Sequence, residues 1–304
     1  APSSARDDWR RQRALMEATG RRHTRGGVFP NFNLQIFIAS LSEPFLKALG
    51  LQSRALSNTL ALELTEVDVP VRGLPAEFDN YKILQLSDLH VDQVPGLLEL
   101  AAGRVKGLSV DLTIITGDVQ SYGFPAAARA AENVASLTAG IDSRDGFLGI
   151  LGNHDCHHLV EHLESRGIRM LVNEHVLIER GEARLHLTGV DDVHMFYTKA
   201  AGHALRARPK DIFSIALVHS SDFADVAADA GYALYLSGHT HGGQICLPGG
   251  RPLMTGLEYH RALARGLWRY GDMTGYTSRG IGITIRARFN CPPEIALLRL
   301  RRLP

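Results

Sequence analysis

The sequence predicts an α/β domain preceded by a helical N-terminal extension. From about residue 65, short apolar runs typical of strands alternate with Ala/Leu-rich stretches long enough for helices. Before that point, a polar, arginine-rich stretch precedes an apolar stretch with broadly helical spacing. With 304 residues, 45% of them hydrophobic, the chain is long enough to bury a large core. No internal repeat is present.

A basic stretch opens the extension. Seven arginines outnumber three carboxylates within residues 1–27. Asp7 or Asp8 is expected to cap a short helix that continues through Glu17, and Gly20 is expected to end it.

An apolar stretch, residues 31–62, follows and nearly completes the extension, whose expected range is residues 1–64. Its spacing predicts one or two helices that pack on the main domain. The alternative is peripheral contact with an anionic membrane surface, because arginines precede the apolar stretch. The sequence contains no run of 18 apolar residues, so no membrane-spanning helix is expected.

The main domain, residues 65–304, is expected to be a single catalytic unit, since no Pro/Ser-rich linker divides it. Helices are expected at residues 95–108, 125–139 and 157–167. Strands are expected at residues 81–86, 112–116, 147–151, 183–190, 212–218, 233–236, 280–288 and 294–300.

Composition excludes some classes of function and leaves others open. A net charge of +1 argues against a nucleic-acid partner, because such binders usually carry a large basic excess. Three cysteines are too few, and odd in number, for a disulfide framework.

We expect the protein in the cytoplasm or peripherally on the inner membrane, although the first residue, Ala1, leaves export open. The oligomeric state is left open.

Polar groups that can bind metals follow five of the expected strands. In an open α/β sheet, the carboxyl ends of the strands form the crevice where ligands bind, so these groups should converge. They are Asp88 and His90, then Asp118, then Asn153, His154 and Asp155, then His219, and finally His239 and His241.

This set of side chains predicts two divalent metal ions. Aspartate, asparagine and histidine form a mixed oxygen and nitrogen set without thiolate, which suits Zn²⁺, Mn²⁺, Fe or Co. The set exceeds the three or four protein ligands of a single zinc site. Two ions about 3.5–4 Å apart are an established device for hydrolysing phosphate esters.

The order of these motifs resembles that of the calcineurin-like metallophosphoesterase superfamily. Its signature is D-x-H, G-D, G-N-H-[DE], a lone H and G-H-x-H, and every part occurs here in order within residues 81–243. The resemblance implies a four-layer α/β/β/α sandwich. It also implies that Asp118 bridges two metals, one held further by Asp88, His90 and His241, the other by Asn153, His219 and His239.

The resemblance also implies catalytic roles for two residues that are not metal ligands. His154 would face the substrate and assist the leaving oxygen, or stabilise charge on the phosphoryl group, and Asp155 would orient it. A carboxylate neighbour favours the imidazolium form, which suits a general acid. Among further residues, Arg279 is the candidate for substrate binding, since a guanidinium fork suits a phosphate. Its alternative is an ion pair with a surface carboxylate, and His194 and His203 are candidates for lining the pocket.

Three later stretches narrow the resemblance to a bacterial branch. They are G-H-T-H-G-G-Q at residues 238–244, S-R-G-I-G at 278–282 and P-P-E-I at 292–295. Val91 and Ser121 depart from the motifs of the phosphoprotein phosphatases, and Gln120 departs from the branch itself. Members of the branch are often membrane-associated or exported phosphodiesterases, and some act in lipid A biosynthesis.

The expected function is hydrolysis of a phosphodiester or pyrophosphate bond with two Mn, Zn or Fe ions. The substrate is expected to be a small molecule or lipid, such as a nucleotide-sugar of the UDP-2,3-diacylglucosamine type. The alternatives are a phosphomonoesterase or nuclease of the same superfamily, and a non-catalytic metal-binding scaffold.

Overall fold

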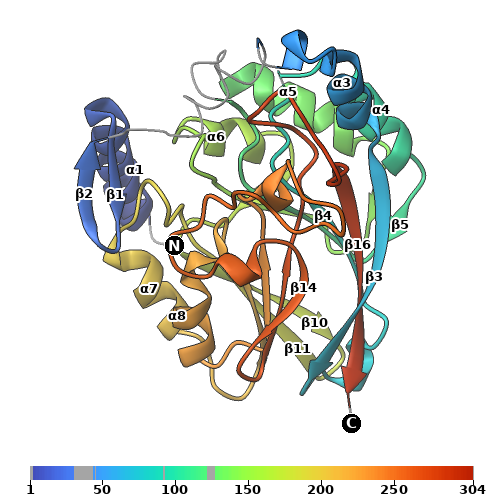
Figure 1. Ribbon diagram of the computed structural model, residues 1–304. Coiled ribbons are helices and arrows are strands. Elements are labelled where there is room, and N and C mark those ends of the chain that lie inside the picture. The colour runs from blue at the N-terminus through green and yellow to red at the C-terminus, as the bar shows by residue number, and fades with distance from the viewer. Residues whose placement is uncertain (1–2, 31–43, 45, 92, 122–126, 304) are drawn as a thin grey trace.

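The computed structural model describes residues 3–30, 44, 46–91, 93–121 and 127–303. Its main elements are two mixed sheets of six strands each (Figure 1). The first sheet has the order β3 (Glu63–Arg72), β16 (Glu294–Leu303), β4 (Lys82–Leu86), β6 (Leu112–Thr116), β8 (Phe147–Ile150) and β9 (Ile168–Met170). The second has the order β10 (Glu174–Arg180), β11 (Ala183–Gly189), β12 (Phe213–Leu217), β13 (Leu234–Ser237), β15 (Met273–Thr277) and β14 (Gly266–Tyr270).

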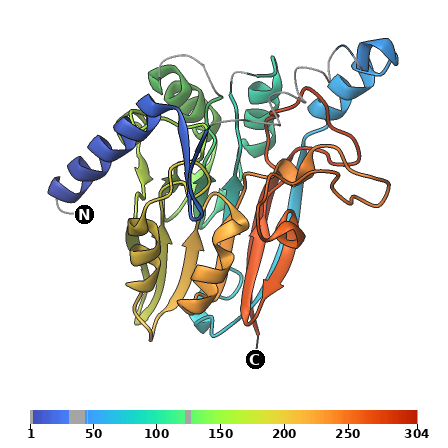
Figure 2. The same ribbon diagram turned by 60° about the vertical axis from the view of Figure 1, so that its left-hand side comes forward.

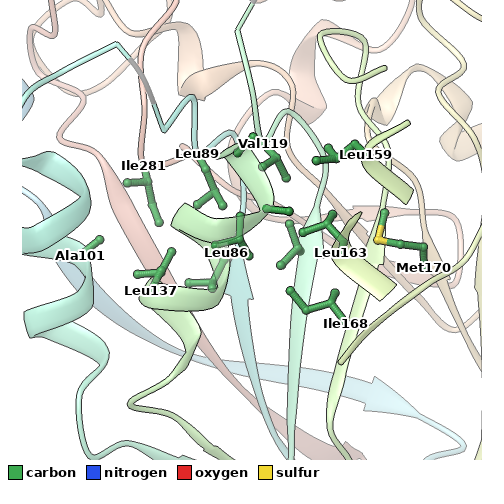
Figure 3. Close-up of a cluster of buried hydrophobic side chains, with 14 of the residues drawn as sticks. Leu86, Leu89, Ala101, Val119, Leu137, Leu159, Leu163, Ile168, Met170 and Ile281 are labelled. Atoms are coloured by element: carbon green, nitrogen blue, oxygen red, sulfur yellow. The ribbon is translucent and has the colours of Figure 1, made fainter. Parts of the chain in front are cut away.

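Three apolar clusters hold the layers together. Alternate side chains of a strand point to opposite faces, so Ile83 of β4 faces the second sheet while Leu84 and Leu86 face helices. The outer face of the first sheet is covered by α4 (Leu97–Val105), α5 (Ala127–Thr138) and α6 (Leu159–Glu164), whose packing Figure 3 shows. The outer face of the second sheet is covered by α7 (Lys199–Arg206) and α8 (Ala224–Asp229). The expected four-layer α/β/β/α sandwich is therefore confirmed.

The expected strand at residues 280–288 is wrong. Isoleucines at positions 281, 283 and 285 alternate as in a strand, but the segment is an irregular loop. Its backbone is held by other groups: the buried Arg288 guanidinium donates to the carbonyls of Arg279, Gly280 and Gly282. Ile281, Ile283 and Ile285 are all buried, although the segment belongs to neither six-stranded sheet.

The N-terminal extension begins with α1 (Ser3–Thr19), followed by a hairpin of β1 (Arg21–Thr24) and β2 (Gly27–Pro30). Because the helix begins at Ser3, the capping role expected for Asp7 or Asp8 is wrong. Both carboxylates lie within the helix and pair with Arg10 and Arg11. Figure 2 shows α1 and the later helix α3 (Gln52–Leu60) at opposite ends of the molecule.

The basic stretch attaches the extension to the main domain. Five of its arginines pair with carboxylates there: Arg6 with Glu164 and Glu174, Arg10 with Glu161, Arg13 with Asp191, Arg22 with Glu258, and Arg25 with Asp225. Residues 31–43 of the apolar stretch lie outside the described residues, so membrane contact stays a prediction. No helix in the described part of the chain is long and apolar enough to cross a bilayer. The boundary at residues 64 and 65 also stays a prediction; β3 already begins at Glu63.

Arg13 is the central contact of this attachment. Its side chain is 1% exposed, pairs with Asp191 and Glu17, and donates to the backbone carbonyls of Gly152 and Asp155. Trp9 Nε1 donates to the same Asp191 carboxylate over 2.7 Å. The helix is therefore fixed directly to the loop that carries Asn153.

Replacing Arg13 by methionine is expected to lower the free energy of unfolding by about 3–5 kcal/mol, because the Asp191 carboxylate stays buried without its cation. Chemical denaturation followed by circular dichroism measures this. The control is Arg11→Met, whose exposed pair with Asp8 is worth about 1 kcal/mol or less. Equal losses of unfolding free energy in the two variants would show that the buried ion pair of Arg13 contributes no more to stability than the exposed pair of Arg11.

Candidate metal centre

The predicted ligands come together at the carboxyl ends of five strands, β4, β6, β8, β12 and β13. Both sheets contribute, since β4, β6 and β8 belong to the first sheet and β12 and β13 to the second. Close approach explains the glycine of the G-N-H-D motif: a Cβ on Gly152 would collide with the carboxylate and backbone nitrogen of Asp118.

The backbone at these ligands is strained. Five non-glycine residues of the site have positive φ angles: Asp88 48°, His90 39°, Asp118 54°, His239 71° and His241 48°. Such conformations cost about 1–3 kcal/mol each and persist where the surrounding structure fixes them, often at functional sites.

The first cluster consists of Asp88, His90 and His241, all buried, with one ligand atom from each lying within 4.8 Å of the others. His90 Nε2 lies 3.2 Å from His241 Nε2, and His241 Nε2 lies 3.5 Å from Asp88 Oδ1. Two imidazole nitrogens and one carboxylate oxygen thus face a common point.

The second cluster consists of Asp118, His219 and His239 within the same limit of 4.8 Å. Asn153 joins it: its Oδ1 lies 2.7 Å from His239 Nδ1 and 3.2 Å from His219 Nε2. The four ligands that the sequence predicts for this site therefore lie close together: Asp118, Asn153, His219 and His239.

Asp118 belongs to the second cluster and also faces the first. Its Oδ2 is 3.2 Å from His219 Nε2 and 3.9 Å from His90 Nε2. This is the placement expected of a carboxylate that bridges two cations. The donor set of two aspartates, four imidazoles and one carboxamide fits divalent ions of the Zn or Mn type.

Without bound cations, the pKa values of some ligands conflict with metal binding, because the shifts of Asp88 and His219 favour their protonated forms. Burial raises the pKa of Asp88 to about 7 and lowers the pKa of His90 to about 3. Burial acts to lower the pKa of His219 too, but the carboxylates around it, with Asp118 first among them, together outweigh burial and raise that pKa to about 10. Divalent cations remove the conflict, because they favour ionised carboxylates and neutral imidazoles.

Surrounding groups orient the ligands. His219 donates from Nδ1 to the Thr116 carbonyl over 2.7 Å, which turns Nε2 toward the cluster. The Ser87 hydroxyl donates to Asp88 Oδ2 over 2.6 Å, and Ser121 Oγ lies 3.0 Å from His90 Nδ1. Nothing in the sequence pattern had indicated these hydroxyl groups.

Asp155 holds the backbone of the centre. Its carboxylate accepts hydrogen bonds from four backbone N–H groups, those of Asp118, Val119, Gln120 and Gly152. This ties the Asp118 turn to the Asn153 loop. The expected role of Asp155, orienting the His154 ring, stays a prediction.

A cavity of about 800 Å³, here called the main cavity, opens beside the centre. It is lined by Asp118, Asn153, His154 and His239, and beyond them by Arg22, His194, Met195 and much of the segment 251–265. A smaller side cavity of about 200 Å³ lies under α1 and is also lined by Asn153 and His154. His194 therefore lines the pocket as expected, whereas His203 is exposed on α7.

Arg279 is not placed where a substrate-binding residue is expected. Its guanidinium pairs with Glu294 over 2.8 Å and with Glu63 over 2.9 Å, and it also donates to Thr65. Among the described residues that line the main cavity, Arg279 is absent. Its ion pairs match the alternative interpretation of this arginine.

Comparison with known proteins shows to which family these motifs belong. A family model described as calcineurin-like phosphoesterase matches residues 81–243, more than half of the chain. The chain belongs to the calcineurin-like phosphoesterase family. The matched residues contain every member of both clusters, together with Asn153 and His154. The protein is thus a metallophosphoesterase, a hydrolase, with two His/Asp clusters that suit a dinuclear divalent metal centre.

Individual relatives agree with this assignment. Phosphodiesterase YaeI of Escherichia coli is 31% identical over 230 residues, covering 72% of this chain and 82% of the relative. The uncharacterized metallophosphoesterase YkuE of Bacillus subtilis is 29% identical over 249 residues, covering 79% and 86%. UDP-2,3-diacylglucosamine pyrophosphatase LpxG of Chlamydia muridarum is 25% identical over 296 residues, covering 78% and 89%.

Proposed function

We propose that this metallophosphoesterase hydrolyses a phosphodiester or pyrophosphate bond in a lipid or nucleotide-sugar substrate, with UDP-2,3-diacylglucosamine as the reference compound. The observation that carries the proposal is the presence of two cavities on the metal centre. Both border Asn153 and His154. A phosphodiester or a substituted pyrophosphate carries an organic group on each side of the bond that is cleaved, so its site needs room for two such groups. A phosphomonoester carries only one.

The lining of the main cavity supports a substrate that is partly apolar and partly anionic. Pro252, Leu253, Met254 and Leu257 contribute apolar surface, and Leu253 is 58% exposed at the rim. Arginines also line the cavity: Arg22, Arg251, Arg261 and Arg265. The names of two relatives, a phosphodiesterase and a UDP-2,3-diacylglucosamine pyrophosphatase, support the same class of substrate.

Different residues of the chain carry out different parts of the reaction. Asn153 and the two clusters would hold the cations, and a pair of divalent ions such as Mn, Zn or Fe would activate water and neutralise phosphoryl charge. His154, whose Nε2 lies 4.0 Å from Asp118 Oδ2, lines both cavities. From that position it can donate a proton to the leaving oxygen.

A substrate panel tests the proposal. An aryl phosphodiester, UDP-2,3-diacylglucosamine in anionic vesicles and an aryl phosphomonoester are assayed with Mn²⁺, Zn²⁺ or Mg²⁺. The kcat/KM of the diester or the pyrophosphate is expected to exceed that of the monoester by about tenfold or more, because only they use both cavities. A preference for the monoester would contradict the proposal. Co-sedimentation with the vesicles tests the accompanying proposal of peripheral membrane contact.

A further inference from the structure

We infer that the N-terminal hairpin contributes Arg22 to the substrate site, where its guanidinium binds a second phosphate group next to the one that is attacked. This inference rests on the proposed function and narrows it to the pyrophosphate class of substrate. Arg22 lies in β1, outside the residues that match the family model. It was not among the sequence-based candidates for substrate binding.

The hairpin is fixed beside the metal centre by its backbone. His23 donates from its backbone nitrogen to the Met195 carbonyl over 2.8 Å, and Tyr197 donates in return to the His23 carbonyl over 2.9 Å. These bonds join β1 to the segment that carries His194. Arg22 is thereby held at the edge of the main cavity, which it lines.

The guanidinium of Arg22 has an unused donor. One terminal nitrogen lies 2.9 Å from Glu258 Oε1 and 3.2 Å from His194 Nε2. The Nε atom is buried, and it has no hydrogen-bond partner among the described residues. Because the protein covers Nε, a ligand oxygen in the cavity would contact the accessible part of this side chain, which is 23% exposed, and not Nε itself.

A single side chain separates this guanidinium from the second cluster. The ring of His194, which Arg22 contacts, lies with its centroid 4.2 Å from that of His239. Arg22 is therefore adjacent to the centre without being a metal ligand. His239, His194 and Arg22 line the same main cavity, so an anionic group attached to the phosphoryl group at the centre can extend past His194 to Arg22.

The charge of the cavity favours a doubly anionic ligand. Four arginines line it, and apart from the metal ligand Asp118 its only lining carboxylate among the described residues is Glu258. Arg261 and Arg265 donate to the backbone carbonyls of Leu257 and Gly250, which bear no net charge. A diphosphate suits this excess better than the single charge of a simple phosphodiester.

Titration calorimetry on the full chain loaded with Mn²⁺ tests the inference without turnover. The probes are methylenediphosphonate, a non-hydrolysable diphosphate analogue, and inorganic phosphate. Arg22→Ala is expected to weaken binding of the diphosphonate about tenfold or more, because a charge-assisted hydrogen bond is lost. Binding of phosphate is expected to change about twofold or less. Arg22→Gln, which keeps most of the side-chain stem, should give the same pattern.

The matched control is Arg25→Ala in the same hairpin, whose guanidinium pairs with Asp225 and does not line the main cavity. It should leave both affinities unchanged. Equal weakening of both ligands in the Arg22 variants, or no weakening, would overturn the inference. A protein that binds diphosphonate through Arg22 but hydrolyses none of the panel would refute the proposed function alone.

Discussion

Replacing Asp118 by asparagine is expected to lower hydrolysis of an aryl phosphodiester by about a thousandfold or more. The carboxylate faces both clusters, with Oδ2 3.2 Å from His219 Nε2 and 3.9 Å from His90 Nε2. Loss of its charge weakens both cation sites together, and metal ions contribute several kcal/mol to the transition state. Steady-state kinetics and metal analysis of the purified variant measure the effect. The bound metal should fall with activity.

The matched control is Asp229→Asn, the same chemical change at an exposed position at the end of α8. It should retain full activity and metal content. Asp118→Asn that keeps both cations and more than about a tenth of the activity would show that Asp118 does not bridge the centre. Circular dichroism of both variants shows whether the fold is intact.

Replacing His154 by alanine is expected to lower kcat by about 10²–10⁴-fold while leaving the metal content unchanged. His154 borders both cavities but belongs to neither ligand cluster. Its expected role is proton donation to the leaving oxygen. The loss should therefore be large for diesters with a poorly acidic alcohol as leaving group and small for nitrophenyl diesters.

His158→Ala serves as the control, because His158 is exposed and lies just before α6 in the same loop. Its kinetics should match those of the unmodified protein. An equal loss in His154→Ala for every leaving group would contradict a role as proton donor. Such a result would leave stabilisation of phosphoryl charge as the role of His154.

Much of the metal centre could be predicted from the sequence for a physical reason. Strands with continuous apolar runs are recognisable, and their carboxyl ends must converge in an α/β sheet. The polar groups that follow them, such as Asp88, Asn153 and His219, therefore meet although they are far apart in the chain. The structure brings all seven predicted ligands together.

Other parts could not be predicted, because they depend on contacts between distant segments that no periodic pattern records. Arg13 supports the Asn153 loop across about 140 residues of chain. The Asp155 carboxylate accepts hydrogen bonds from backbone N–H groups, and no sequence motif identifies such partners. Arg279 looked suited to a phosphate, yet the position of Glu294 on a neighbouring segment decides its partner.

Loop 280–288 shows that secondary structure, too, depends on contacts that the sequence pattern does not record. Its alternating isoleucines match a strand, but strand formation also needs a neighbouring edge. Here Arg288 satisfies the carbonyl groups instead, so the pattern alone gives the wrong element.

Reconstitution of the metal-stripped protein tests the central claim most directly. Chelated protein is titrated with Mn²⁺, Zn²⁺ or Fe²⁺, and aryl phosphodiester hydrolysis is measured beside the metal content of each sample. We predict no activity in the stripped protein and a recovery that saturates at two cations per chain, one for each cluster. Full activity in the stripped protein, or saturation at one cation, would contradict a dinuclear phosphoesterase.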